Sequence, residues 1–130
     1  MQVIDDELLD NIISEAKANS RLRINYNFHP SLSDKCQRLL NAMEPGTVMP
    51  IHRHEVAEMY ILLRGSLTVT FHDDEKKITD SQLLDLRKGI HGVQIPPRTW
   101  HSLEVHEKGT VIFEVKEGPF IPHSIGGILE

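Results

Sequence analysis

The sequence predicts an all-β protein, a jelly-roll barrel preceded by one short N-terminal α-helix. Three observations support this fold class. Apolar residues follow a helical period only as far as residue 19. From there to residue 116 they occur in short, strand-like runs. Turn-forming residues separate these runs about every ten positions, which is typical of a β-sandwich or barrel.

The helix is expected over residues 4–19, because the apolar residues in this range recur every three to four positions and form one face. Asp5, Asp6 and Glu7 lie in its first turn, where the helix dipole favours negative charge. A polar surface and an apolar stripe predict a helix that packs on the outside of the barrel.

Residues 21–29 alternate strictly between polar and apolar side chains, as in a strand with one buried face. Further strands are expected at residues 36–43, 58–63, 67–72, 77–86, 91–95, 101–106 and 110–116. Proline and glycine positions, together with an Asp-Asp pair, mark the turns between them.

The chain has 130 residues, which is enough for one domain. We expect three parts: an N-terminal helix (1–19), a β-barrel (20–118) and a C-terminal tail (119–130).

Composition argues against several classes of partner. The net charge is −5 and no basic run exceeds two residues, so the chain has no patch for nucleic acid. No apolar stretch approaches the length of a membrane span, and the acidic N-terminus does not resemble a secretory signal. Cys36 is the single cysteine, which excludes an intrachain disulfide and a cysteine-based zinc site. We therefore expect a cytoplasmic protein with a small-molecule ligand, no nucleic acid and no membrane.

His52, His54 and Glu58 form the most informative cluster. They share one parity, so an uninterrupted strand would direct all three into one space. Two imidazoles and a carboxylate suit a divalent transition metal. His101 is the best-placed fourth ligand, because it follows the rigid Pro96-Pro97 turn and begins the next apolar strand. Without a thiolate, zinc, iron, nickel, manganese and copper all stay open.

The spacing Gly46-x5-His52-x-His54-x3-Glu58-x6-Gly65 matches every position of the first motif of the cupin superfamily. From ordinary residue frequencies, a chance match is on the order of one in ten million per starting point. The chain thus resembles a cupin. The resemblance implies a double-stranded β-helix that holds one divalent metal ion.

The second cupin motif, Gly-x5-Pro-x-Gly-x2-His-x3-Asn, is matched in part. Pro96 and His101 keep their spacing, whereas Gly89 is one residue early. Arg98 replaces the second glycine and Val105 replaces the asparagine. These departures retain the metal ligand His101 and remove any role of the family's asparagine.

More narrowly, the chain resembles the WbuC-type cupin-fold metalloproteins. The resemblance covers residues 5 to about 120 and runs through the alternating 21–29 segment, Cys36–Asn41, His52-Arg53-His54 and Phe113–Pro119. It implies an association with bacterial surface-polysaccharide gene clusters, and it leaves the reaction open.

Two interpretations of the polar residues in the first strand stay open. In one they are the solvent face of an edge strand whose other face is core. In the other they line the barrel mouth and bind an anionic or hydroxyl-rich ligand. The residues are Arg21, Arg23, Asn25, Asn27 and His29, and Arg38 and Asn41 are candidates to extend the same pocket.

Four protein ligands leave coordination positions open on the ion, which is typical of a catalytic site. We expect an isomerase- or epimerase-like enzyme, or an oxygenase, acting on a small polar substrate such as a sugar derivative. His29 or Tyr60 would move a proton as catalytic residue. The alternative is a non-catalytic binding or sensing module. Met59, Ile61 and Leu63 form an outward apolar face that needs cover from the helix or a second subunit, so we also expect a homodimer.

Overall fold

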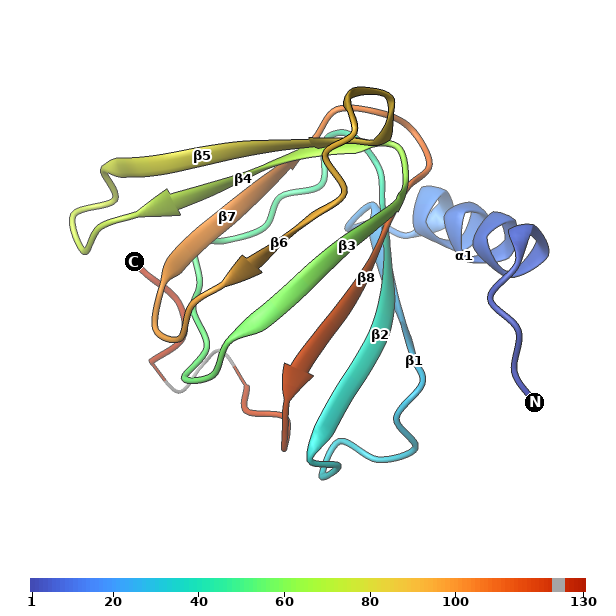
Figure 1. Ribbon diagram of the computed structural model, residues 1–130, viewed down its shortest axis with the longest axis horizontal. Coiled ribbons are helices and arrows are strands. Elements are labelled where there is room, and N and C mark those ends of the chain that lie inside the picture. Colours follow the sequence, from blue (N-terminus) through green and yellow to red (C-terminus); the bar gives the residue numbers. More distant parts are fainter. Residues whose placement is uncertain (123–125) are drawn as a thin grey trace.

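Antiparallel strands form two facing sheets that enclose the core (Figure 1). The structure is a computed structural model that describes residues 1–122 and 126–130. The helical elements are α1 (Asp6–Ala18) and a single 3-10 turn, η1 (Leu86–Lys88). The strands are β1 (Arg23–Asn27), β2 (Cys36–Met43), β3 (Glu58–Arg64), β4 (Ser66–His72), β5 (Ile78–Asp85), β6 (Gly92–Ile95), β7 (Trp100–Val105) and β8 (Thr110–Glu117). The all-β class with a short N-terminal helix is confirmed.

The larger sheet has the order β1-β2-β8-β3-β6, and the smaller sheet has the order β5-β4-β7. All neighbouring strands are antiparallel. In the larger sheet β8 lies between β2 and β3, and its Glu114 is in register with Leu39 on one side and Tyr60 on the other. This register places Glu114 between Leu39 of β2 and Tyr60 of β3.

The space between the sheets is filled by apolar side chains from nearly every strand. Because side chains alternate across a strand, only every second residue contributes. The buried members of this core are Met43, Tyr60, Leu62, Leu67, Val69, Leu84, Ile95, Leu103, Val105 and Ile112. Tyr60 is the polar exception, and its hydroxyl belongs to the site described below.

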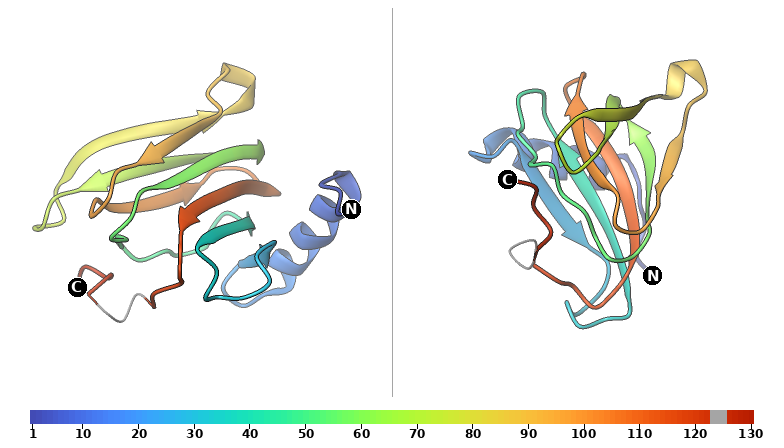
Figure 2. Two further views of the ribbon diagram at one scale, coloured as in Figure 1. Left: turned by 60° about the horizontal axis from the view of Figure 1, so that its bottom comes forward. Right: turned by 90° about the vertical axis from the view of Figure 1, so that its left-hand side faces the viewer.

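Helix α1 covers part of the outer face of the larger sheet (Figure 2). Its stripe of Leu9, Ile12, Ile13 and Ala16 packs on Leu40, Ala42 and Val111. The helix begins after Asp5, whose carboxylate accepts a hydrogen bond from Leu8 N–H at 3.0 Å, a cap that typically contributes about 1 kcal/mol. No helix in the described parts of the chain is long and apolar enough to span a membrane.

Gly65 makes the tight turn between β3 and β4. Its φ is +80°, and a Cβ there would lie 2.8 Å from Thr110 Cα. Only glycine tolerates both conditions. The final glycine of the first motif is therefore required by the turn that follows β3.

The C-terminal residues return to the barrel beside the candidate site. Ile128 forms an isolated bridge with His52, and backbone hydrogen bonds of 2.9 and 3.0 Å flank it on both sides. Residues 123–125 of the predicted tail lie outside the described residues. The described end of the tail is thus held against the segment that carries the first two histidines.

Candidate metal centre

The structure brings His52, His54, Glu58 and His101 together. One possible ligand atom from each lies within 4.8 Å of the other three. His52, Glu58 and His101 are buried, and His54 is half-buried. Of these, only Glu58 lies within the strand β3, whereas His101 is the second residue of β7.

His52 and His54 reach the site from an irregular segment, and this corrects the expectation of one uninterrupted strand. Residues 53–57 form no ladder, and His52 makes only isolated bridges. Its backbone exchanges hydrogen bonds of 3.0 and 2.9 Å with His101, while Arg98 N–H donates to His54 O at 2.7 Å. Pro50, which has no N–H to donate, and a bend at residues 55–56 explain why a regular strand is not formed. Backbone hydrogen bonds to residues of the second motif, and not the alternation of a regular strand, therefore position His52 and His54.

Two of the imidazoles are oriented by backbone carbonyls. His52 Nδ1 lies 2.9 Å from Pro50 O, and His101 Nδ1 lies 2.8 Å from Thr99 O. Because a carbonyl only accepts, each Nδ1 carries a hydrogen, which leaves Nε2 as the ring atom that can bind a metal ion once it carries no proton. This outer hydrogen bond is the usual support for a metal-binding histidine.

Glu58 is the only carboxylate in this group. Its Oε1 lies 2.7 Å from His101 Nε2, and its Oε2 lies 3.6 Å from His54 Nε2. Oε2 has no hydrogen-bond partner among the described residues. Burial acts to raise the pKa of Glu58, but the His101 hydrogen bond and the charges of His54, His101 and Lys116 lower this pKa to about 2. An ionised, partly unsatisfied buried carboxylate beside imidazole nitrogens fits a divalent cation.

Tyr60, a predicted catalytic residue, is fully buried next to this carboxylate. Its hydroxyl donates to Glu58 Oε1 at 3.0 Å and lies 3.2 Å from His101 Nε2. Burial and the nearby charges of Glu58 and Glu114 raise the pKa of Tyr60 well above its usual value. The phenol thus stays protonated, and its proton is engaged in holding Glu58.

A cavity of about 310 Å³ opens onto the histidines from the β1–β2 end of the larger sheet. Of the predicted ligand-binding residues, Arg23, Asn25 and Asn27 line it, and so does His29. The remaining residues of its wall are Leu32, Gln37, Leu39, Asn41, Met49, Pro50, His52, His54, Glu114, Lys116 and Phe120.

Arg21 and Arg38 are not part of this wall. Arg21 precedes β1 and is exposed. Arg38 is exposed on β2, next to the cavity-lining Gln37 and Leu39, so strand alternation turns its side chain to the opposite face. β1 is an edge strand, and its polar face also borders the cavity, so the two interpretations of that face do not exclude each other.

Glu114 is a site residue that the sequence analysis did not identify. It is buried on β8, and Asn41 Nδ2 donates to its Oε1 at 3.0 Å. Burial and the charge of Glu58 raise the pKa of Glu114 to about 7, against smaller opposing effects of Asn41, Lys116 and His101. In the sequence, Glu114 stands two residues after the apolar Ile112 and is therefore on the same face of the strand as this core residue.

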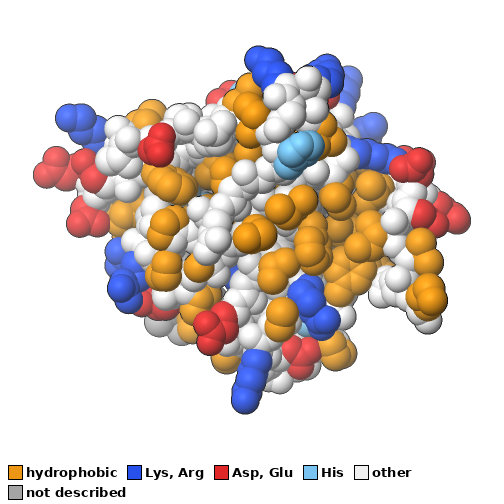
Figure 3. Space-filling view, in the orientation of Figure 1, with side chains coloured by type: hydrophobic (Ala, Val, Ile, Leu, Met, Phe, Trp, Pro, Cys, Tyr) orange, Lys and Arg blue, Asp and Glu red, His pale blue; other side chains and the backbone are white. Residues whose placement is uncertain are grey.

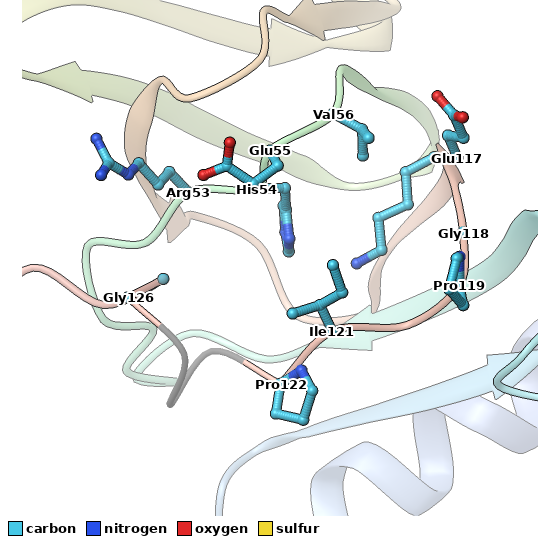
Figure 4. A pocket seen from close by; sticks show the side chains of 12 residues that line it. Arg53, His54, Glu55, Val56, Glu117, Gly118, Pro119, Ile121, Pro122 and Gly126 are labelled. Carbon is cyan, nitrogen blue, oxygen red and sulfur yellow. The ribbon is translucent and has the colours of Figure 1, made fainter.

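A second hollow, of about 80 Å³, lies on the other side of His54. Figure 4 shows His54 pointing into it, with Ile121 of the C-terminal segment opposite. His54 and Lys116 line both hollows. The C-terminal segment therefore forms one wall beside the candidate ligands.

Comparison with known proteins gives a family match and a fold. A family model described as "Domain of unknown function (DUF6016)" matches residues 4–84, which include His52, His54 and Glu58 and end before His101. No curated protein matches the chain.

Solved structures of cupin-fold proteins are similar to this one. CapF, the capsular polysaccharide assembling protein of Staphylococcus aureus, is 19% identical with a TM-score of 0.65, over 81% of this chain and 29% of CapF. The DMSP lyase DddQ from Ruegeria pomeroyi is 16% identical with a TM-score of 0.61, over 77% of this chain and 49% of DddQ. A cupin superfamily protein from Desulfitobacterium hafniense is 15% identical with a TM-score of 0.59, over 73% of this chain and 76% of that protein.

The chain spans about half the length of DddQ and less than a third of CapF. At these identities the likeness shows the fold alone. It confirms the cupin barrel that the first motif predicted.

Proposed function

The chain belongs to the DUF6016 family, and from the geometry of its site we propose that it is a metal-dependent enzyme acting on a small, polar, sugar-like substrate. One observation carries the proposal. Four convergent ligand atoms adjoin a polar cavity of about 310 Å³, and His52 and His54 belong to both. That volume is at the lower end of the range for small-molecule sites.

His52, His54, Glu58 and His101 would hold the ion. When bound, a divalent ion supplies a Lewis acid that polarises a carbonyl or hydroxyl oxygen. Tyr60 fixes the Glu58 carboxylate, and backbone carbonyls fix two of the imidazoles. These ligands suit zinc, iron, nickel, manganese or copper, and elemental analysis of the purified protein identifies the metal.

Two groups on the cavity wall are placed to hold or move a proton at the substrate, namely His29 and Glu114. Both are buried in the wall that faces the histidines. Burial and the charge of Glu58 raise the pKa of the Glu114 carboxyl to about 7, which suits proton transfer near neutral pH, and an imidazole has one nitrogen that donates and one that accepts. This supports isomerase- or epimerase-like chemistry, with oxygenation as the alternative if the ion is iron.

The biological setting is proposed from two likenesses. The chain resembles WbuC-type proteins, which are associated with surface-polysaccharide gene clusters. CapF, one of the similar folds, is a capsular polysaccharide assembling protein. We therefore place the substrate among cytoplasmic sugar derivatives used in such biosynthesis.

A homodimer is proposed from one face of the larger sheet. Helix α1 covers Leu63 but leaves the outward side chains nearer the start of β3 open. Figure 3 shows apolar side chains gathered over β3 and β8 next to α1. Met59 is 39% exposed there, Ile61 and Val115 are half-buried, and the half-buried Phe113 lies at the border with α1, against whose cluster it packs. We name these four residues the β3–β8 face.

The second candidate function is a non-catalytic binding or sensing module. It is favoured by the neutral amides of Asn25, Asn27 and Asn41 on the cavity wall, which bind ligands but do not transfer protons at neutral pH.

A substrate screen separates the two functions. Metal-loaded protein is incubated with sugars and nucleotide sugars, and products are followed by mass spectrometry. We expect the wild type to convert a substrate, and His54→Ala to lose both metal and turnover. His29→Ala should keep its metal and lose turnover about a hundredfold or more. Glu104→Gln, at an exposed position on β7, is the control that should match the wild type.

If the wild type binds sugars but converts none with any of the candidate metals, the enzyme proposal fails and the binding module replaces it.

A further inference from the structure

Two buried polar atoms of the cavity wall lack hydrogen-bond partners in the described part of the chain. They are His29 Nε2 and Asn41 Oδ1. The exposed fractions of the two residues are only 5% and 4%. Buried polar atoms in folded proteins are nearly always hydrogen-bonded. Their common position beside one cavity indicates that a bound ligand supplies the missing partners.

The hydrogen on His29 can be assigned from its other ring nitrogen. Arg38 N–H donates to His29 Nδ1 at 3.0 Å. Arg38 O also lies 3.1 Å from Nδ1, but it already accepts from Phe28 N–H at 2.8 Å. A peptide N–H can only donate, so Nδ1 is the acceptor and the neutral ring carries its hydrogen on Nε2. His29, a residue of the cavity wall, therefore carries a buried N–H donor that has no partner among the described residues.

Asn41 offers the complementary group. Its Nδ2 donates to Glu114 Oε1 at 3.0 Å, which assigns the amide orientation and leaves Oδ1 as an acceptor. Asn41 is in register with Asn25 on the neighbouring strand. The wall thus combines an N–H donor, a carbonyl acceptor and further neutral amides.

His29 lies four residues along the chain from Asn25, the register partner of Asn41, so separate groups of one ligand must satisfy the two atoms. That ligand must offer an acceptor to His29 and a donor to Asn41. Several hydroxyls on one ligand offer both, whereas a carboxylate or phosphate only accepts and an ammonium only donates. The nearby cation Arg23 is already engaged, because its Nη1 donates to Val48 O at 2.6 Å. Phe120 lines the same cavity with its ring partly exposed, which supplies apolar surface for the face of a sugar ring.

We propose that the β1–β2 wall of the cavity is a hydroxyl-recognition subsite for a carbohydrate-type ligand, with His29 Nε2–H as donor and Asn41 Oδ1 as acceptor. The inference rests on the proposed function, because it describes how the substrate of the metal centre would be held. It goes further in assigning the recognition of ligand hydroxyls to His29 and Asn41.

The test compares two probes, D-gluconate and hexanoate. Both have six carbons and one carboxylate, and only gluconate carries hydroxyls along its chain. Their affinities for metal-loaded protein are measured by titration calorimetry, with the metal content checked after each run. We expect gluconate to bind at least about tenfold more tightly than hexanoate, as for one or two buried hydrogen bonds.

Two substitutions at one position separate the donor from its structural support. His29→Asn can retain an acceptor for Arg38 N–H and removes the Nε2 donor, so gluconate should bind about tenfold more weakly. His29→Gln places an amide N–H near the Nε2 position and should keep most of the gluconate affinity. Asn41→Leu should weaken gluconate binding to a similar degree. Hexanoate affinity should be unchanged in all three variants, and thermal unfolding checks that each is folded.

Equal affinity of the two probes for the wild type would overturn the subsite and leave the metal-dependent function standing. Equal loss of both probes in His29→Asn would also overturn it, since the effect would not be on hydroxyls. If neither probe binds a fully metal-loaded protein, the proposed function itself fails, and the subsite fails with it.

Discussion

At the scale of single residues, the candidate site depends on where protons reside. His52 and His101 are each fixed by a backbone carbonyl at Nδ1, and Tyr60 directs its proton to Glu58. The possible ligand atoms of these two histidines, of Glu58 and of His54 lie within 4.8 Å of one another. Such outer hydrogen bonds typically matter about 10- to 100-fold in metal affinity.

Glu114 gives a prediction about pH at the same scale. Its pKa is raised from 4.5 to about 7 by burial and by the charge of Glu58. Below pH 4.5 both the folded and unfolded states carry the proton, so this group does not make the free energy of unfolding depend on pH. Between pH 4.5 and 7 only the unfolded state releases it, so the free energy of unfolding falls by up to about 3 kcal/mol.

Glu114→Gln removes this titration and nearly preserves the shape of the side chain. In metal-free protein we expect Glu114→Gln to be more stable than the wild type at pH 8, by up to about 3 kcal/mol, with the difference vanishing near pH 4. Urea unfolding in the presence of a chelator at several pH values measures it. A difference that stays constant from pH 4 to 8 would show that Glu114 does not titrate as described.

At the scale of elements, the segment before β3 holds two ligands without being a strand. Its backbone is fixed by pairing with β7 and with the C-terminal segment. Arg53, between the two histidines, stacks over Trp100 with its guanidinium carbon 4.1 Å from the ring centroid. Trp100 in turn donates to Asp74 at 2.8 Å. Arg53 and Trp100, which are sequence neighbours of the ligand histidines, thus hold the segment before β3 against β7.

Most elements could be predicted from the sequence because their periods are unambiguous. The helical stripe of residues 4–19 and the alternation in β1 each allow one assignment. The four candidate ligands could be found because their spacing is specific to a known motif.

The irregular segment and Glu114 could not be predicted in the same way. Around Pro50 the sequence has no regular period. Strand parity grouped His52, His54 and Glu58, which do lie together in the structure, although His52 and His54 are not on a strand with Glu58. Strand β8 carries apolar residues on both faces, Ile112 toward the interior and Phe113 toward α1. Parity alone therefore could not tell whether Glu114 faces the cavity or the outside.

At the scale of the whole molecule, the β3–β8 face predicts self-association. A Met59→Lys substitution places a charge at the most exposed residue of this apolar surface, so it should convert a dimer to a monomer. Ile78→Lys is the matched control, because Ile78 is 63% exposed on β5 in the other sheet. Sedimentation equilibrium gives the mass of each protein. A monomeric wild type, or a Met59→Lys protein that stays dimeric, would refute the assignment of this face.

The central claim is that one divalent ion is held by His52, His54, Glu58 and His101. The most direct test is elemental analysis of protein dialysed after loading with a divalent metal such as zinc. We predict one ion per chain for the wild type and for His106→Ala, which removes an exposed histidine immediately after β7. His101→Ala should remain folded by circular dichroism and retain no stoichiometric metal. Full metal content in folded His101→Ala protein would contradict the account.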